Sequence, residues 1–497
     1  MITRTTRRQH RWRWVALAAL LVAEAMNLLD TTIVQVAAPV IHDRLGGTES
    51  EIQWFSAAYT LPFALLLITG GRLGDIAGRR RMFLAGVAGF AVASVACALA
   101  PTAALLIGAR AVQGATAALI IPQTFGLIKA MFRGQERARA LGRIGLVMGL
   151  AAVSGPVLGG VLTHADLLGA SWRPVFLVNV PLAVAVLAAG PLLSEDSADH
   201  RPRLDLTGTG LAVLGIGLIV VPLVDGTGDG WPAWHWLTLT AGVAVLVAFG
   251  ASQRAAARRG RHPLVETSLF TGRGFPAALV TSTLFFAVMN GLMLVIVLHL
   301  QVGLGRDVLT GGLTLLPWSA GTAVASWVAG SLLVPRYGAR VMFVGLVTLA
   351  AGLLGAITAY RVGTPGGYPW PLLPALAVSG LGLGLFTVPF FTTALNGLRA
   401  EETGSGSGLL NAVQQLGAAA GVTVLGSVFL HGLRGGTGDT PAHAAGTAAQ
   451  HAFWLALAFV AAATVGATVM STAPRRPVDD GAADQVTEPV PTGPAGS

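Results

Sequence analysis

Apolar stretches of about 20 residues alternate with short polar segments along almost the whole chain. A stretch of this length crosses the hydrocarbon core as an α-helix, because a helix pairs its backbone polar groups within itself. Fourteen stretches fit this description, near residues 14–40, 51–70, 82–100, 104–128, 142–163, 174–193, 207–224, 234–251, 275–299, 308–333, 339–360, 372–396, 405–430 and 451–472. The pattern predicts an all-α polytopic membrane protein with 14 transmembrane helices.

Composition agrees with a protein whose solvent is lipid. Apolar residues make up 53% of the 497 residues and charged residues only 11%, whereas about 25% of residues are charged in a soluble domain. The formal net charge is +9, and a basic balance also occurs in nucleic-acid-binding proteins. Here the basic residues lie in short loops between apolar stretches, so topology explains them and no nucleic-acid partner is expected.

The basic residues are concentrated in alternate loops. If the N-terminus is cytoplasmic, 26 of the 32 lysines and arginines lie on the cytoplasmic side, five lie outside, and Arg110 lies within a span. Cytoplasmic loops carry an excess of basic residues, which predicts that both termini face the cytoplasm and that the chain resides in the cell inner membrane. Lys129 is the only lysine, which is typical of a bacterium with a GC-rich genome.

The spans divide into two sets of six with an additional pair between them. We therefore predict five segments: a cytoplasmic tail (1–13), an N-terminal six-helix bundle (14–193), a central segment with two extra helices (194–274), a C-terminal six-helix bundle (275–472) and a disordered cytoplasmic tail (473–497). The loops at 71–81 and 330–340 follow the second and tenth spans and share a Gly-x-Leu start with later Gly and Arg residues. Repeats with a site between them are typical of transporters.

Five short segments carry a family resemblance. They are LDTTIVQVAAP (29–39), GRLGDIAGRRR (71–81), RAVQGATAA (110–118), GPVLGG (155–160) and SWRPVFLVNVP (171–181). In this order they resemble the major facilitator superfamily, and within it the 14-helix drug:proton antiporter family. Gln35, Ala38 and Pro174 depart from the family pattern.

The resemblance implies a major-facilitator fold and a proton-coupled secondary antiporter. Such a protein exports small hydrophobic or amphipathic drugs or antibiotics by alternating access, and the proton gradient drives it without any cofactor. The alternative that the sequence leaves open is a facilitator or importer of a small polar solute, which needs more hydrogen-bonding groups at the midplane than the spans provide. A membrane sensor needs a folded soluble domain, and the predicted loops are too short for one.

Glu24, Asp30 and Arg110 are the ionisable residues expected inside the membrane. A charge at this depth costs at least about 2.5–3.5 kcal/mol, so it is paired, hydrated or neutralised by a proton. Desolvation favours a protonated carboxyl group and a guanidinium favours the ionised form, so Glu24 and Asp30 are predicted proton carriers. The family resemblance implies that Arg110 takes part in proton transfer with the first span, so all three are the predicted proton-coupling groups. Glu24 and Asp30 lie about 9 Å and about 120° apart on a helix, so we expect two separate sites. Glu24 could instead line the cargo cavity, and Arg110 could form a fixed ion pair.

Two segments are predicted to gate the transport cycle. The loop at 71–81 can form a latch between the two halves on the cytoplasmic side, although its arginines also serve as topological anchors. The stretch 155–160 combines a helix-interrupting proline with glycines that permit close helix contact. The predicted gating residues are Gly71, Arg72, Asp75, Gly78, Arg79, Arg80, Gly155, Pro156, Gly159 and Gly160.

Polar, methionine and aromatic side chains within the spans are the candidates for binding cargo. Such adaptable surfaces suit promiscuous binding, although lipid contact or packing between helices is the simpler explanation for each. The predicted cargo-binding residues are Gln113, Phe286, Met289, Asn290, Asn411, Gln414 and Gln415.

Enzymatic and metal-dependent functions find no support in the sequence. Cys97 is the only cysteine, so the chain cannot form an internal disulfide framework or a cysteine-based metal site. Neither a phosphate-binding loop nor an HExxH metalloprotease motif occurs. The expected partners are a small-molecule cargo, protons and the lipid bilayer, and the oligomeric state is left open.

Overall fold

The computed structural model describes residues 4–46, 50–132, 134–165, 169–193, 205–225, 232–259, 265–362, 367–395, 402–435 and 440–473, and every regular element in these ranges is helical. The first half comprises α1 (Arg4–Leu45), α2 (Ser50–Ala77), α3 (Arg79–Leu99), α4 (Ala103–Ala117), α5 (Ile121–Met131), α6 (Gly134–His164), α7 (Pro174–Leu177), α8 (Asn179–Ala188) and η2 (Gly190–Leu192). Between the halves lie α9 (Leu206–Asp225), α10 (Ala233–Arg258) and η3 (Thr267–Phe270). The second half comprises α11 (Gly274–Leu298), η4 (His299–Gly303), α12 (Val308–Thr314), α13 (Leu316–Val328), η5 (Ala329–Leu333), α14 (Val334–Tyr337), α15 (Arg340–Val362), α16 (Leu372–Leu395), α17 (Glu402–Arg434) and α18 (Pro441–Thr472).

The all-α prediction is confirmed. Each predicted span coincides with one helix or with consecutive helices. Within the described ranges, eleven helical stretches are long and apolar enough to cross a membrane, and α9 contains the shorter apolar stretch Thr207–Pro222. The two other predicted spans correspond to α2 and α6. The helices are therefore compatible with 14 spans.

Helix ends differ from the predicted boundaries in two places. Helix α1 begins at Arg4, so most of the predicted N-terminal tail extends the first helix, since no glycine or proline interrupts it. The fourth predicted span is divided into α4 and α5, and Pro122 lies in the first turn of α5, where proline is favoured. The predicted C-terminal tail lies outside the described residues from position 474 onward.

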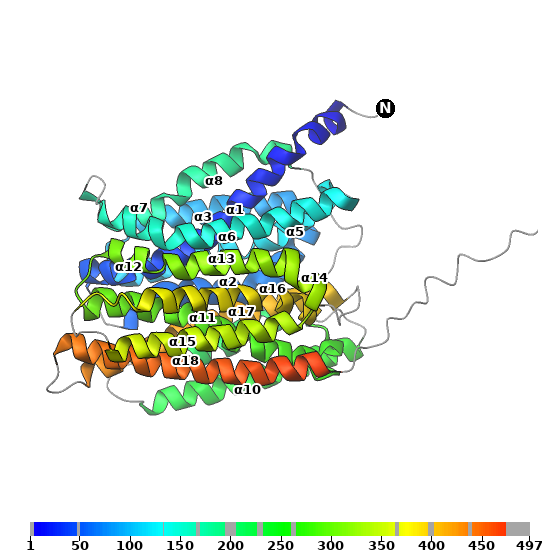
Figure 1. Ribbon diagram of the computed structural model, residues 1–497. Helices are drawn as coiled ribbons and strands as arrows, with labels where there is room; N and C mark the ends of the chain where they lie inside the picture. Colours follow the sequence, from blue (N-terminus) through cyan, green and yellow to red (C-terminus); the bar gives the residue numbers. More distant parts are fainter. Residues whose placement is uncertain are drawn as a thin grey trace, which may run out of the picture.

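The helices form two bundles that meet along two seams. In the first bundle α1 packs on α6 and α2 packs on α4, and in the second α11 packs on α17 and α15 packs on α16. One seam joins α2 to α17, and the other joins α6 to α12 and α13. The helices run nearly parallel in Figure 1, with α8 and α10 at opposite edges of the molecule.

The bundles contact one another near the end where α1 finishes and α2 begins, which we call the α1–α2 end. A Cβ atom on Gly160 would lie 3.0 Å from the Cα atom of Leu309, so the backbones of α6 and α12 are in close contact there. The Gln301 side chain donates a hydrogen bond to the Val36 carbonyl over 2.9 Å. Gln53 of α2 is 3.3 Å from the hydroxyl group of Ser427 on α17.

Helix α9 covers the α2–α17 seam, and α10 packs on α9. Ile216 and Val220 of α9 pack against a small apolar cluster that contains Leu61 of α2 and Ala419 of α17. Near the opposite end from the α1–α2 end, the hydroxyl group of Thr209 is within hydrogen-bonding distance of that of Thr69. Helix α9 therefore shields one bundle seam from the surroundings.

Candidate functional site

The centre of the N-terminal bundle holds a buried ion pair. Arg110 of α4 donates from Nη1 to Oδ2 of Asp30 on α1. Asp30 is completely buried and Arg110 is 1% exposed. Two opposite charges thus lie in a region from which bulk water is excluded, where each depends on the other for compensation.

Neutral polar groups complete the environment of the Asp30 carboxylate. The side-chain amides of Gln113 and Asn179 each donate to Oδ1 of Asp30 over 2.8 Å. The Gln113 amide also donates to the Ser94 hydroxyl over 2.9 Å. With Arg110 on Oδ2, both oxygens of the carboxylate accept hydrogen bonds. The side chains come from α1, α3, α4 and α8, so we call them the four-helix network.

Arg110 also connects this network to α2. Its Nε atom donates to the Phe55 carbonyl over 2.9 Å, and its Nη1 atom donates to the Gln113 side-chain oxygen over 2.8 Å. The guanidinium lies over the Tyr59 ring, with 4.4 Å between Cζ and the ring centroid, a favourable cation–π geometry. A change at Asp30 therefore acts directly on the groups that hold α2 in place.

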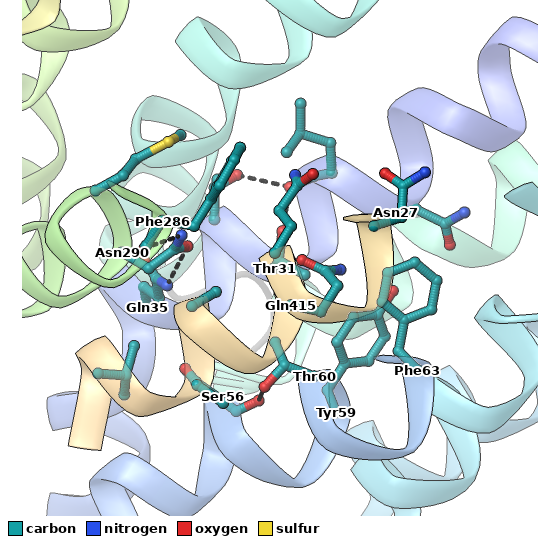
Figure 2. Close-up of a pocket in the computed structure, with 18 of the residues that line it drawn as sticks. Asn27, Thr31, Gln35, Ser56, Tyr59, Thr60, Phe63, Phe286, Asn290 and Gln415 are labelled. Atoms are coloured by element: carbon teal, nitrogen blue, oxygen red, sulfur yellow. Dashed lines mark hydrogen bonds between the residues drawn. The ribbon is translucent and has the colours of Figure 1, made fainter. Parts of the chain in front are cut away.

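A cavity of about 220 Å³ lies between the two bundles and beside this network. Its walls come from α1, α2, the α4–α5 region, α11 and α17, and the residues that line it include Glu24, Asn27, Thr31, Gln35, Ser56, Tyr59, Arg110, Phe286, Met289, Asn290, Met293, Asn411, Gln414 and Gln415. Figure 2 shows polar side chains of α1 and α2 and the Phe286 ring around this space. The site thus pairs a mixed polar and apolar cavity with a buried charge pair.

All the predicted cargo-binding residues except Gln113 lie on the cavity wall. Phe286, Met289, Asn290 and the three predicted polar residues of α17 line the cavity. Gln113 does not lie on the cavity wall, because its amide is completely buried between Asp30 and Ser94. Gln113 therefore orients the carboxylate and does not contact cargo in this arrangement.

The predicted proton-coupling residues lie in two places. Glu24 lines the cavity and its Oε1 atom has no hydrogen-bond partner among the described residues. Asp30 lies behind the cavity wall in the four-helix network, and Arg110 contacts both regions. Glu24 and Asp30 are thus on different faces of α1, as their spacing of six residues predicted. The sequence did not indicate which of the two carboxyl groups faces the cavity.

Comparison with known proteins decides the family. The sequence profile of the Major Facilitator Superfamily matches residues 20–422. The chain belongs to the major facilitator superfamily. It is accordingly a multi-pass membrane transporter of small molecules.

Three relatives come from Streptomyces species. The chain is 45% identical over 418 residues to the "Probable actinorhodin transporter" of Streptomyces coelicolor, covering 84% of this chain and 72% of the relative. It is 35% identical to a puromycin resistance protein of Streptomyces alboniger, covering 84% and 82%. It is 33% identical to the "Tetracenomycin C resistance and export protein" of Streptomyces glaucescens, covering 83% and 75%.

Solved structures support the superfamily fold. A structure from work on proton-dependent oligopeptide transporters has a TM-score of 0.63 at 16% identity, covering 93% of this chain and 98% of that one. A bacterial homologue of the human lysosomal transporter Spinster also has a TM-score of 0.63, at 17% identity, covering 93% and 97%. At these identities the likeness concerns the fold alone.

The predicted cytoplasmic latch of this superfamily member lies in and after the last turns of α2. Gly78 has φ 98°, a conformation that glycine adopts without strain, and it separates α2 from α3. Arg80 donates to the Gly190 carbonyl over 3.0 Å, and Arg79 lies against Gly126 of α5. These contacts are within the N-terminal bundle, so a tie between the two halves remains a prediction.

The other predicted latch residues are Gly71, Arg72 and Asp75. A Cβ on Gly71 would lie 3.4 Å from the Pro122 side chain, which is ordinary packing. Arg72 is half-buried on α2. The side chain of Asp75 lies outside the described residues, so its predicted role as the acid of the latch is not addressed.

The stretch 155–160 lies where α6 contacts two other helices. Gly155 packs against the Thr32 side chain, and a Cβ on Gly159 would lie 3.0 Å from the Ile33 carbonyl. The carbonyl of Pro156 lies against Gly312 of α12. Helix α6 continues through Pro156, so these residues mainly permit close contact of α6 with α1 and across the bundle seam.

Several site residues were not predicted from the sequence. Ser94 and Asn179 are polar residues in apolar stretches, and that signal alone could have marked them. Phe55 acts through its backbone carbonyl, which no side-chain pattern reveals. Asn27, Thr31 and Gln35 are four residues apart on α1, so their common helix face was readable from the spacing.

Proposed function

We propose that this transporter exports small hydrophobic or amphipathic drugs, antibiotics among them, in exchange for protons. The relatives support the cargo class, since their names refer to transport of or resistance to actinorhodin, puromycin and tetracenomycin C. The proposal assigns transport and no catalytic role, and it requires no cofactor because the proton gradient supplies the energy.

The observation that carries proton coupling is the completely buried Asp30–Arg110 pair beside the cavity. A proton that reaches Asp30 removes the negative charge and releases Arg110 from its strongest partner. Arg110 then shifts relative to the Phe55 carbonyl and the Tyr59 ring, and α2 moves with them. Because α2 forms one seam with α17, protonation at Asp30 changes the contact between the bundles.

The arrangement of the cavity supports loading from the cytoplasm. In the proposed orientation, both termini and the Glu24 end of the cavity face the cytoplasm, whereas the α1–α2 end faces outward. The bundle contacts at Gly160–Leu309, Gln301–Val36 and Gln53–Ser427 then close the outer side. Glu24 lies on the cavity wall, where either a proton or cargo can reach it.

Resistance in cells tests export directly. Expression in an efflux-deficient bacterial host is expected to raise the inhibitory concentration of puromycin several-fold, and an uncoupler is expected to cancel the gain. A host that carries the Asp30→Asn variant serves as the control for expression. Increased sensitivity to every antibiotic tested, together with uptake of a polar solute, would favour the importer alternative.

The glycine contact between α6 and α12 provides a test of alternating access. Gly312→Ala is expected to separate the bundles at the α1–α2 end, because the added Cβ would collide with the Pro156 carbonyl. Gly108→Ala on α4 is the matched control, since a Cβ there meets nothing within 4 Å. Each glycine-to-alanine substitution stabilises its helix by about 1 kcal/mol. The two variants therefore differ only in the collision with the Pro156 carbonyl.

Cysteine labelling measures this separation. The native Cys97 is buried, so a cysteine introduced at Gln53 can be followed with a membrane-impermeant maleimide. We expect several-fold faster labelling from outside in Gly312→Ala, together with reduced transport, and no change in Gly108→Ala. Because Gln53 lies on the α2–α17 seam, equal labelling rates in the two variants would argue against a gate in which both seams open together at the α1–α2 end.

A further inference from the structure

Helix α1 presents a line of polar side chains to the cavity. Asn27, Thr31 and Gln35 are spaced four residues apart and all line it, as Figure 2 shows. We call these three residues the α1 stripe. Their positions span about 12 Å along the helix, comparable to the length of a two- or three-ring molecule.

Asn27 is an unpaired amide in the cavity wall. It is only 5% exposed, and neither its Oδ1 nor its Nδ2 atom has a hydrogen-bond partner among the described residues. Buried polar groups are almost always paired. An amide left in this state at the edge of a cavity is therefore available to a ligand.

The orientation of the Gln35 amide follows from a chain of hydrogen bonds. The Phe286 backbone carbonyl can only accept, so the Asn290 nitrogen faces it, at 3.1 Å. The Asn290 oxygen then faces Gln35 and accepts from Nε2 over 3.4 Å. Among the residues that the structure describes, this leaves Oε1 of Gln35 as a buried acceptor without a partner.

Thr31 also presents an acceptor. Its hydroxyl group donates to the Leu28 carbonyl over 2.8 Å, which uses its only hydrogen and leaves the oxygen lone pairs free. All three members of the α1 stripe thus offer acceptors, and only Asn27 also offers an unpaired donor. The facing wall on α11 contributes Phe286, Met289 and Met293, which suit a flat apolar surface.

We propose that the α1 stripe selects cargo that carries hydrogen-bond donors, namely hydroxyl or amino groups, along one edge of a flat apolar body. Arg110 is the basic side chain on the cavity wall, and Asp30 already neutralises it. The same cavity therefore disfavours anionic cargo. This inference rests on the proposed export function and specifies what the cavity recognises.

A matched ligand pair tests donor recognition. The probes are 4,4′-dihydroxystilbene and 4,4′-dimethoxystilbene, which share a flat body and differ in their donors. Binding to the purified protein in detergent is followed by fluorescence, without any gradient. We expect wild type to bind the dihydroxy probe at least about tenfold more tightly, since each hydrogen bond of this kind approaches a factor of ten.

Variants assign the preference to the α1 stripe. Asn27→Leu has a similar volume without polar atoms and is expected to lower the affinity ratio several-fold, because only the acceptors of Thr31 and Gln35 remain. Thr31→Val is expected to lower the ratio by a smaller factor and provides a second route if Asn27→Leu does not fold. Gln450→Leu on α18, away from the cavity, is the matched control and should keep the wild-type ratio.

Two results would overturn the inference: a wild-type ratio near one, or a wild-type ratio preserved in both Asn27→Leu and Thr31→Val. The wild type could also prefer the dihydroxy probe because the methyl groups of the other probe are too bulky. That preference would persist in Asn27→Leu and Thr31→Val, which distinguishes it from donor recognition. Because binding is measured without a gradient, failure of donor recognition leaves proton-driven export untouched. Conversely, loss of proton coupling would leave the binding ratio unchanged.

Discussion

Asp30→Asn is expected to lower proton-driven export by at least about 100-fold, which corresponds to about 2.7 kcal/mol. Asparagine has nearly the same shape as aspartate, and its oxygen can still accept from Gln113 and Asn179. It cannot take up or release a proton, so the step that moves Arg110 is lost. Everted membrane vesicles with an imposed pH gradient measure the effect, and gel filtration of a fluorescent fusion confirms that the variant folds.

Asp43→Asn is the matched control for this experiment. Asp43 lies on the same helix and its side chain is exposed, so the same chemical change occurs without disturbing a buried network. We expect this variant to transport as wild type does. If Asp30→Asn also transports at the wild-type rate, the Asp30–Arg110 pair has only a structural role.

Arg110→Leu is expected to destabilise the protein by about 3–5 kcal/mol, the usual cost of leaving a buried charge without its partner. The substitution also removes the hydrogen bond to the Phe55 carbonyl and the contact with the Tyr59 ring. Unfolding in mixed detergent micelles, followed by near-ultraviolet circular dichroism, measures the loss. Transport falls in parallel, because the link between Asp30 and α2 is gone.

The double variant Asp30→Asn/Arg110→Leu separates charge from packing. Asparagine removes the uncompensated charge, so the double variant is expected to regain most of the stability that Arg110→Leu loses. Its transport should nevertheless remain absent. A double variant as unstable as Arg110→Leu alone would mean that lost packing, and not the buried charge, determines the cost.

Much of the fold was predictable because lipid imposes simple rules on sequence. An apolar stretch of sufficient length has to form a helix, and each predicted span coincides with helical structure. Helix geometry also separated Glu24 from Asp30 correctly, since six residues turn the chain to another face. The break between α4 and α5 was not predicted, although Pro122 in the first turn of α5 explains it.

Tertiary packing accounts for what the sequence did not reveal. Gln113 was expected on the cavity wall, but the pairing of α4 with α1 and α3 places its amide between Asp30 and Ser94. Nothing in an almost uniformly apolar span indicates which face contacts protein and which contacts lipid. The four-helix network thus depends on helix neighbours that are distant in sequence, as the approach of Asn179 to Asp30 illustrates.

The position of the cavity could not be predicted from the sequence either. Asn27, Thr31 and Gln35 share a helix face by their spacing alone, yet only the packed structure reveals that this face borders the space between the bundles. The orientation of the Gln35 amide depends in turn on the Phe286 carbonyl of the other bundle. Recognition of cargo is therefore a property of both bundles together.

Transport by purified protein in liposomes tests proton coupling most directly. Liposomes containing wild type or Asp30→Asn are loaded with an encapsulated pH-sensitive dye, and puromycin flux is followed with and without an imposed pH gradient. Proton coupling predicts that wild type accumulates puromycin against its concentration gradient only when the pH gradient is present, with proton movement in the opposite direction. Accumulation that is indifferent to the pH gradient, or equal in Asp30→Asn, would contradict it.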